Sequence, residues 1–477
     1  MQVRRAGASV NLVFAGVLFF IQMLLLTLTA INVQAVPPAA AAEGRRFAEL
    51  VHQGELAQAG AVKAQIEQRL FGAIKEKVAA QMEEAVRAKA EGETLLYLQK
   101  SAGYGAVRNM LEGLSQLGAA ESVKQLMTKL DKTEAARIRQ SQEELQRQAA
   151  LKAVERVIYT GPVQHIFFHP LIAYPERAFD GDLEEKGYND WFVTVPEFRK
   201  ILESLYQKNF ILIDIHTLYE EKTENGKNAL IPKPLKLPKG KKPLILSVDD
   251  LNYYQYMMRN GNVYKLILDD TGNIATYSLN PSGQAVISKD NEIIPILDQF
   301  VREHPDFSLD GVKGVIALTG YEGVLGYRTN ERESPSYAEE RQQALAVIKG
   351  LKETGWSFAS HGYGHLNARS ISLASLQGDT RRWLEEVEPL IGPTDVYIYP
   401  FGSSVLPGDP KFQFLLNSGF RVLCSVGPNP YMKFGSDYLM MDRRHMDGIA
   451  LHYEAALVKD LFDAREVIDR IRPPFRP

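Results

Sequence analysis

Short apolar runs alternate with amphipathic segments over the last two thirds of the chain. Apolar runs such as "PLILSVDD" (243–250) and "VKGVIALTG" (312–320) are separated by amphipathic stretches such as "NEIIPILDQFVREH" (291–304). This alternation of strand-like and helix-like segments is typical of parallel β/α units. About seven strands in roughly 310 residues suit a barrel better than a small open sheet. We therefore expect an α/β fold, with a distorted (β/α) barrel domain over residues 163–477.

One segment interrupts this alternation. Residues 255–290 contain the turn sequences "DDTGN" (269–273) and "NPSG" (280–283) between strand-like runs. Turn sequences of this kind predict β-hairpins. We expect residues 255–290 to form a β-hairpin insertion within the barrel domain.

Residues 36–158 have a different, helical pattern. From residue 44 they are rich in Ala, Glu, Gln, Lys and Arg and contain no proline. Apolar residues recur at a spacing of four from Val62 to Met82. On a helix such a row drifts by about 40° at each step, which argues against a long two-stranded coiled coil. We predict an all-α stalk or bundle here.

The N-terminus carries an uncharged apolar segment, residues 12–30, with Arg4 and Arg5 before it. As a helix it nearly spans the ~30 Å hydrocarbon core of a bilayer, and the preceding positive charge favours a cytoplasmic N-terminus. We predict that residues 1–35 comprise this N-terminus and a single-pass transmembrane anchor. A cleaved signal peptide is the alternative, because "VQA" (33–35) offers a small-residue cleavage site. Both interpretations place the rest of the chain outside the cytoplasm.

Composition adds three constraints. The net charge of -3 and the pI near 6.4 give no footprint for a nucleic-acid partner. Cys424 is the only cysteine, so no internal disulfide can form. The lysine-rich stretch 231–242 precedes a strand, and we expect it at the barrel end opposite the carboxyl ends of the strands, as a solvated loop.

Two Asp-Asp pairs follow apolar runs. Asp269 and Asp270 stand before Thr271 and Gly272, so a hairpin turn accounts for them. The pair in residues 249–250 ends an apolar strand of the β/α series, and no glycine-containing turn follows at once. In a β/α barrel the carboxyl ends of the strands form the catalytic face, so this pair is a candidate site.

Histidines supply the remaining ligands. In "WSFASHGYGHLNA" (356–368) a strand-like run ends in His361, and His365 follows four residues later, which would place both rings on one face of a helical turn. Two histidines and one carboxylate form a facial triad, and a second carboxylate beside it is placed for general-base work. A second His-x-x-x-His pair, His165 and His169, falls within a predicted strand, where four residues span about 13 Å. His169 at that strand end could face the pocket, but a structural role is favoured.

The ordered set "SVDD", "SHGYGH", "YPFG" and "DRRHMDG" resembles the polysaccharide deacetylase family, also called carbohydrate esterase family 4, over residues 163–455. The resemblance implies that Asp250, His361 and His365 bind a metal and that Asp249 is the general base. It places the substrate and oxyanion positions at Tyr399 and Phe401, with the Phe401 backbone N–H as the donor.

The resemblance also bears on the end of the sequence. Arg443, or its neighbour Arg444, matches the arginine that orients the base. The family's final L-x-H motif, whose histidine is the general acid, is unclear here; His452 in "IALHYEA" is the nearest match and His445 is another. The cofactor implied is a divalent metal: zinc suits two histidines and a carboxylate, and cobalt, nickel or manganese would fit too.

The function implied is metal-dependent hydrolysis of N-acetyl (or O-acetyl) groups on an extracellular or cell-wall polysaccharide. Two alternatives remain open. One is hydrolysis of non-sugar carbon–nitrogen amide bonds. The other is a surface carbohydrate-binding protein on the same fold with little or no turnover.

Overall fold

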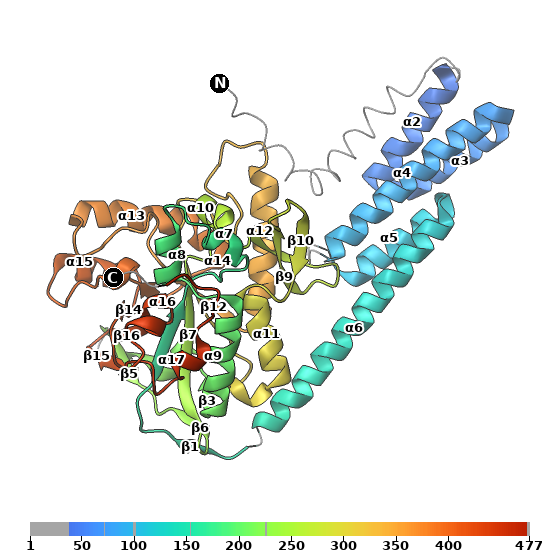
Figure 1. The fold of residues 1–477 in the computed structure, drawn as a ribbon. Helices are drawn as coiled ribbons and strands as arrows, with labels where there is room; N and C mark the ends of the chain where they lie inside the picture. Colours follow the sequence, from blue (N-terminus) through green and yellow to red (C-terminus); the bar gives the residue numbers. More distant parts are fainter. Residues whose placement is uncertain (1–37, 71, 99–101, 153, 225–226, 475–477) are drawn as a thin grey trace, which may run out of the picture. The chain divides into compact units, whose positions relative to one another are not determined.

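The computed structural model describes residues 38–70, 72–98, 102–152, 154–224 and 227–474 (Figure 1). The chain divides into two compact units between residues 142 and 143. The predicted transmembrane segment, residues 12–30, lies outside the described residues. Among the helices within those residues, none is both long enough and apolar enough to cross a membrane.

The first unit is helical. Its buried core is apolar and includes Phe47, Val78 and Leu111. The predicted row at spacing four does not run along one helix, because α3 ends before Leu70, whose backbone is extended, and α4 begins at Gly72. The helices are α2 (Pro38–Gln53), α3 (Leu56–Arg69), α4 (Gly72–Leu98), α5 (Tyr104–Leu117) and α6 (Ala120–Lys152), the last of which continues past the division.

The second unit is an α/β barrel, as predicted. Seven parallel strands pair in chain order, and the last pairs with the first to close the ring. Consecutive neighbours of this kind are the signature of β/α barrels. The strands are β2 (Gln164–Phe168), β7 (Lys242–Asp249), β11 (Gly314–Leu318), β12 (Trp356–Ser360), β13 (Val396–Ile398), β14 (Val422–Val426) and β16 (Leu439–His445).

Helices pack around this ring, for example α12 on β12 (Figure 1). The α9 helix begins with a capping box, in which Thr194 and Glu197 bond each other's backbone N–H groups. The helices of the unit are α7 (Pro175–Ala178), α8 (Glu185–Trp191), α9 (Val195–Gln207), α11 (Ile293–Glu303), α12 (Tyr337–Glu353), α13 (Leu373–Glu386), α14 (Glu388–Ile391), α15 (Pro410–Asn417), α16 (Gly448–His452) and α17 (Ala464–Val467), with short 3₁₀ turns η3 (Ile215–Leu218), η4 (Pro305–Phe307) and η5 (Pro400–Gly402).

The ring is distorted because two strands change neighbours half-way. The first residues of β7 pair with β3 (Phe210–Leu212), and only Ser247–Asp249 pair with β11. Likewise the first part of β16 pairs with the antiparallel β15 (Tyr431–Phe434), and only its end reaches β2. The seven-stranded ring is therefore complete only near the carboxyl ends of the strands, where the predicted site lies.

Alternate side chains of each strand enter two separate cores. On β7, Leu244, Leu246 and Val248 join the outer core beneath the helices. Ile245 belongs to the inner core of the barrel. Side chains two residues apart point to the same face of a strand, so Ser247 and Asp249 also point inward.

Two small antiparallel sheets contribute to the inner core at the amino-terminal end of the barrel. Leu230, Leu235 and Leu237 belong to the inner core together with the barrel residues. The lysine-rich stretch 231–242 is therefore at the end opposite the carboxyl ends of the strands, as predicted. The predicted solvated loop is wrong in part, because Lys236–Pro238 form a paired strand and Leu235 and Leu237 are buried. The strands of this region are β1 (Arg156–Ile158), β4 (Tyr219–Glu224), β5 (Lys227–Pro232) and β6 (Lys236–Pro238).

The insertion after β7 is a three-stranded antiparallel sheet. It comprises β8 (Lys265–Leu268), β9 (Ile274–Leu279) and β10 (Ala285–Ser288), so the predicted hairpins are present. Its first residues differ from the prediction because they form the short helix α10 (Gln255–Arg259). Asp269 accepts hydrogen bonds from the backbone N–H groups of Thr271 and Asn273, both at 2.9 Å, which confirms its turn role.

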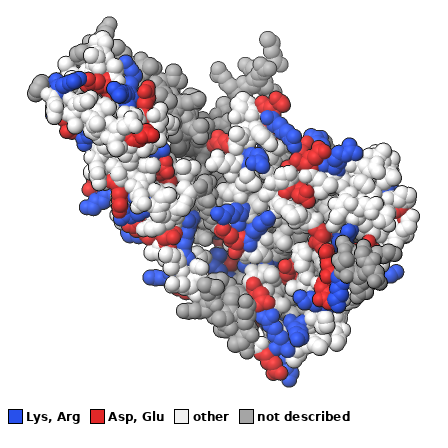
Figure 2. Space-filling model, turned by 180° about the vertical axis from the view of Figure 1, so that it is seen from behind, with Lys and Arg blue, Asp and Glu red and all other residues white. Residues whose placement is uncertain are grey.

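Charged side chains of both signs share the surface. Among the described residues on the face drawn in Figure 2, Lys and Arg are interspersed with Asp and Glu. Mixed charge of this kind is typical of a soluble globular surface.

Candidate active site

The two adjacent aspartates at the end of β7 separate into two environments. Asp249 is the last strand residue and points into the barrel. In a continued strand Asp250 would point outward, toward the helices. Instead its backbone is left-handed, with φ of 58°, which ends the strand and redirects the side chain. Both carboxylates are buried, Asp249 at 2% and Asp250 at 6% exposure.

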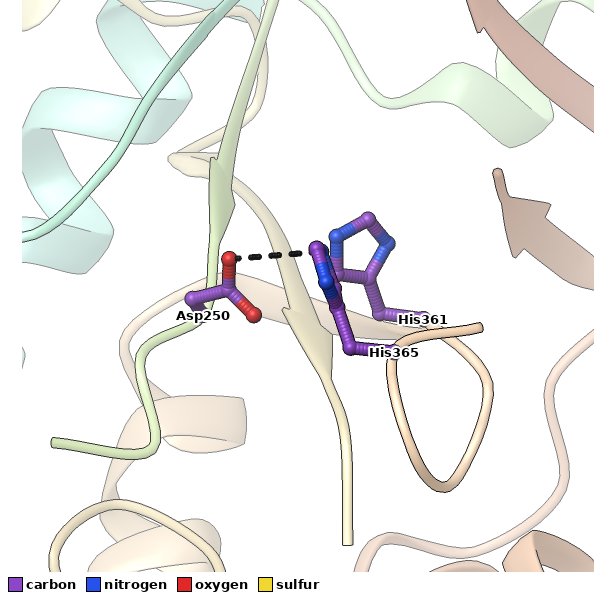
Figure 3. A group of neighbouring side chains, drawn as sticks. All are labelled: Asp250, His361 and His365. Carbon is purple, nitrogen blue, oxygen red and sulfur yellow. Dashed lines mark ion pairs between the residues drawn. The ribbon is translucent and has the colours of Figure 1, made fainter. Parts of the chain in front are cut away.

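Asp250, His361 and His365 form a cluster (Figure 3). One ligand atom from each lies within 4.8 Å of the others, and the His365 Nε2 is 3.7 Å from the Asp250 Oδ2. His361 directly follows β12, whereas His365 lies in a loop with φ of 52°. The histidines therefore converge through a loop, and the predicted helical turn is absent from this part of the described chain.

The donor set fits a divalent metal. The His361 Nδ1 donates a hydrogen bond to the Ile398 carbonyl at 2.8 Å, which leaves its Nε2 lone pair for an ion. The Tyr254 hydroxyl donates to the Asp250 Oδ1 at 2.6 Å, so the Oδ2 that faces His365 remains for coordination. Two ligands on one tetrahedral zinc, each at about 2.0–2.1 Å, stand roughly 3.3 Å apart. The His365 Nε2 and the Asp250 Oδ2 are 3.7 Å apart, which is close to this value.

The protonation states agree with this assignment. Burial lowers the pKa of His361, against the opposing effect of Asp249 and Asp250, so its imidazole is neutral as a ligand must be. Burial raises the pKa of Asp250, but His365 and His361 outweigh it, and the pKa falls below the usual value. The cluster thus offers the neutral imidazole of His361, the carboxylate of Asp250 and a second imidazole from His365.

The loop between the two histidines is held by Asp379 on α13. Its Oδ2 accepts from the Tyr363 N–H at 2.8 Å and its Oδ1 from the Gly364 N–H at 2.7 Å. A side chain at Gly362 would place Cβ only 2.9 Å from the Asp379 Oδ2, and the backbone there has φ of 66°. The glycines of "SHGYGH" therefore allow the carboxylate to lie against the loop.

Asp249 makes a bidentate ion pair with Arg443 on β16. The two contacts are 2.7 and 2.9 Å, and the Arg443 side chain has no exposed surface. Burial raises the pKa of Asp249, but the guanidinium and His361 lower it to about 2. Asp249 is therefore ionised at any ordinary pH. Arg444 pairs instead with Asp460, so of the two adjacent arginines it is Arg443 that contacts Asp249.

A polar network continues beneath this pair. Arg443 Nη1 also donates to the Ser247 Oγ at 3.1 Å, and His165 Nε2 lies 3.1 Å from the same oxygen. Burial, together with the nearby Arg443, lowers the pKa of His165 well below its usual value. His165 is thus a neutral structural residue inside the barrel.

Three further histidines lie at or after strand ends of the rim. His169 follows β2, and its charge helps to lower the pKa values of both Asp249 and Asp250. Its Nδ1 donates to the Trp191 carbonyl at 3.0 Å. His445, at the end of β16, has both nitrogens paired with carboxylates, at 2.7 and 2.9 Å. His452 lies on the exposed face of α16 and contacts the ring of Tyr453.

The two predicted site residues in "YPFG", Tyr399 and Phe401, lie in different environments. Phe401 has a left-handed backbone with φ of 58°, and its ring lies 4.5 Å from the ring of His365. The Tyr399 side chain is fully buried in the outer core and packs against Tyr397. The structure therefore brings Phe401 to the metal ligands and leaves the Tyr399 ring beneath the helices.

Comparisons with known proteins were made for the whole chain. Among the solved structures that match is the Streptococcus pyogenes deacetylase PplD in complex with acetate, at 12% identity, covering 61% of this chain and 94% of that one with a TM-score of 0.35. A Bacillus anthracis protein described as a polysaccharide deacetylase matches at 14% identity, over 60% of this chain and 65% of its own, also with a TM-score of 0.35. A Mycobacterium smegmatis protein with the same description matches at 19% identity over 33% and 46%, with a TM-score of 0.22.

The chain resembles polysaccharide deacetylases. No family model and no curated protein sequence matches it. At these identities and TM-scores the matches say nothing about the chemistry of the site, so the site is defined by its own geometry. That geometry consists of the Asp250, His361 and His365 cluster beside the ion pair of Asp249 and Arg443.

Sequence reasoning missed two residues that shape the site. Tyr254 follows Asp250 by four residues, and only its contact with the carboxylate reveals its role. Asp379 occupies a helix position between the buried Leu376 and Trp383. An acidic residue on the apolar face of an amphipathic helix is the signal that could have drawn attention to it.

Proposed function

We propose that this protein is a metal-dependent deacetylase that removes N-acetyl (or O-acetyl) groups from a polysaccharide. The observation that carries the proposal is the pairing of two differently held carboxylates. Asp250 stands with two histidines as a ligand set, while Asp249 is ionised and oriented by Arg443 beside it. One carboxylate for the metal and one for the proton is the division of labour that metal-assisted hydrolysis requires.

Zinc is the metal that we propose for Asp250, His361 and His365, with cobalt, nickel or manganese as alternatives. Bound there, the ion would polarise the acetyl carbonyl and activate a water molecule. Asp249 then takes the proton of the attacking water, and Arg443 holds its carboxylate in place during the transfer. The Phe401 backbone N–H donates to the oxygen that gains negative charge.

For the leaving group we propose His169 as the general acid. Its charge acts on both carboxylates and helps to lower the pKa values of Asp249 and Asp250. Its Nδ1 is engaged by the Trp191 carbonyl, which leaves Nε2 to donate a proton to the departing nitrogen or oxygen. His445 would first have to break two ion pairs, and His452 has an exposed position on α16.

Acetate release from N-acetylglucosamine oligomers tests the proposal. The zinc-loaded full chain is compared with Asp249→Asn and Asp250→Asn, and with Asp270→Asn from the twin Asp-Asp pair as the matched control. We expect Asp249→Asn to keep zinc and lose turnover, Asp250→Asn to lose zinc, and Asp270→Asn to behave as wild type. Equal release by wild type and Asp249→Asn would refute the assigned mechanism.

The same assay separates the alternative functions. Binding of oligomers by the wild type without acetate release would favour a carbohydrate-binding protein. Release from simple acetamides, with none from any acetylated sugar, would favour a hydrolase of non-sugar amides. His169→Ala should lower the turnover of amides while zinc content stays constant, whereas His452→Ala and His445→Ala should leave it within a few-fold of wild type.

We also propose that residues 12–30 anchor the chain in a membrane with the barrel outside the cytoplasm. The support is the uncharged apolar run with arginines before it. Protease accessibility in intact cells tests the orientation, and the mass of the mature chain distinguishes an anchor from a cleaved signal peptide.

A further inference from the structure

The residues that follow β7 fold back on Asp250. The backbone is left-handed at both Asp250 and Tyr253, with φ of 58° and 54°. With these two residues the chain reverses, and the hydroxyl of Tyr254 donates to the Asp250 Oδ1 at 2.6 Å. A contact this short is typical of a hydroxyl that donates to a charged carboxylate. One oxygen of the ligand Asp250 is therefore already engaged by the protein.

The hydroxyl of Tyr254 is itself held from the neighbouring strand. Its oxygen lies 2.6 Å from the Oγ1 of Thr319, which directly follows β11. Because the tyrosine proton goes to the carboxylate, the Thr319 hydroxyl must donate to the tyrosine oxygen. Tyr254 and Thr319 are 3% and 0% exposed, so both bonds are shielded from water. A chain of two hydrogen bonds therefore runs from Thr319 through Tyr254 to Asp250.

The backbone of Thr319 is fixed as well. Asn252, which has no exposed surface, accepts from the Thr319 N–H at 3.2 Å and donates to the Thr319 carbonyl at 2.9 Å. Further along the β11 loop, Arg328 donates to the Tyr253 carbonyl at 2.9 Å. The loops after β7 and β11 are therefore tied together at several points, which fixes the Thr319 hydroxyl relative to Asp250.

The other oxygen of Asp250 is left for a metal. The Oδ2 faces the histidines and lies 3.7 Å from the His365 Nε2 (Figure 3). A carboxylate that binds through one oxygen leaves more of the coordination sphere to imidazoles, which suit zinc. A carboxylate that binds through both oxygens adds an oxygen ligand, and oxygen ligands suit manganese. The state of the Oδ1 therefore bears on which metal the site prefers.

We propose that Tyr254, held by Thr319, restricts Asp250 to a single coordinating oxygen and so gives the site a preference for zinc over manganese. This inference rests on the metal site of the proposed function and goes beyond it, because it assigns metal selectivity to a residue that is not a ligand. Tyr254 is a positioning residue, since it acts on the metal only through Asp250. Without its hydroxyl the Oδ1 is free to coordinate, and the preference for zinc should fall.

The dissociation constants of zinc and of manganese, measured on the full chain, test this inference. Competition with a chromophoric chelator measures zinc binding, and the electron paramagnetic resonance signal of the unbound ion measures manganese binding. For Tyr254→Phe we expect zinc binding to weaken about tenfold, as is usual when a ligand loses its hydrogen-bond partner, and manganese binding to change less than about twofold or to tighten. The ratio of the two constants is the decisive readout, because a merely loosened site would weaken both metals by the same factor.

Thr319→Val removes only the donor to the tyrosine oxygen, so it should shift the ratio in the same direction by about threefold. In the Tyr254→Phe background it should add nothing, because Thr319 acts through the hydroxyl that is already gone. Tyr327→Phe is the matched control. Tyr327 is also buried and donates its hydroxyl to the Leu266 carbonyl at 2.8 Å, and this variant should keep the wild-type ratio. Thermal unfolding shows whether each variant is folded.

Three results would overturn the inference: an unchanged ratio in Tyr254→Phe, an equal loss of both metals, or additive effects of the two substitutions. If the wild type binds zinc and releases acetate while the ratio does not change in Tyr254→Phe, the inference fails and the proposed function stands. If the ratio falls but the wild type releases no acetate, the inference stands without the deacetylase function. If the wild type binds neither metal, the metal site fails and the inference fails with it.

Discussion

Asp379 offers a way to weaken metal binding without touching a ligand. It accepts from two consecutive backbone N–H groups in the loop between His361 and His365, and it is buried, at 8% exposure. Asp379→Asn keeps the size of the side chain but replaces one acceptor oxygen with an NH₂ group. One of the two N–H groups of the loop then faces a donor.

The magnitude follows from that single lost bond. A hydrogen bond to a charged acceptor contributes about 1.5–3 kcal/mol, and a buried donor without a partner costs a similar amount. If the loop must keep its present shape to bind metal, that cost appears in the binding equilibrium. Since about 1.4 kcal/mol is tenfold in a dissociation constant, we expect zinc affinity to fall roughly 10- to 100-fold.

Competition against a chromophoric zinc chelator measures this affinity in the full chain. Asp298→Asn is the matched control, because Asp298 is likewise a buried helix aspartate that accepts a hydrogen bond, from the Trp356 indole at 3.0 Å. It should bind zinc as the wild type does. A folded Asp379→Asn protein with wild-type zinc affinity would refute the claim that this carboxylate shapes the metal loop.

Three further predictions follow from buried charges. Burial raises the pKa of Glu292 from 4.5 to about 8, so the folding stability of the wild type falls as the pH rises between these values. Glu292→Gln should remove this pH dependence and be more stable than the wild type at pH 8, by about 5 kcal/mol at most. Denaturant titrations of both proteins at pH 5 and pH 8 measure the difference. An equal slope in both proteins would contradict it. Arg443→Met leaves Asp249 buried without the guanidinium, so the pKa of Asp249 should rise. In the pH profile of kcat/KM, the acidic limb should then move to higher pH by at least one unit. An unmoved limb would exclude the ion pair as the cause of the low pKa of Asp249. Arg472→Met breaks the buried bidentate ion pair with Glu197 and should lower the free energy of unfolding by roughly 3–5 kcal/mol, measured by chemical denaturation. A decrease below about 1 kcal/mol would show that the ion pair does not hold the C-terminal segment in place.

Much of the barrel was predictable because its signal is local. Alternating strand-like and helix-like segments indicate the fold class, and strand ends then indicate the rim. The Asp-Asp pair at 249–250 and the pair His361 and His365 were found this way. The turn at Asp269 was found from its neighbours in sequence.

What sequence did not reveal depends on contacts between distant segments. The choice of Arg443 over Arg444 follows from which of two adjacent side chains faces the barrel interior. The sequence favours a structural role for His169 and leaves open that it faces the pocket. Since β2 pairs with β7 in the ring, the end of β2 lies beside the end of β7 that carries both aspartates. Spacing along the chain carries no information about that closure. The C-terminal candidates for the general acid, His452 and His445, come from the family resemblance.

The separation of Asp249 from Asp250 depends on a single backbone conformation. Strand alternation alone would send one of two adjacent side chains into the barrel and the other under the helices. The left-handed φ at Asp250 cancels that alternation, and the Tyr254 hydroxyl and the histidines then hold its carboxylate at the rim. Such a conformation is strained for a residue with a side chain, although aspartate tolerates it better than most. The twin pair at 269–270 has the same sequence but lies in a turn, with no ring of strands to converge on it. The chemistry of an Asp-Asp pair is therefore set by the closed half of the barrel around it and not by the two residues alone.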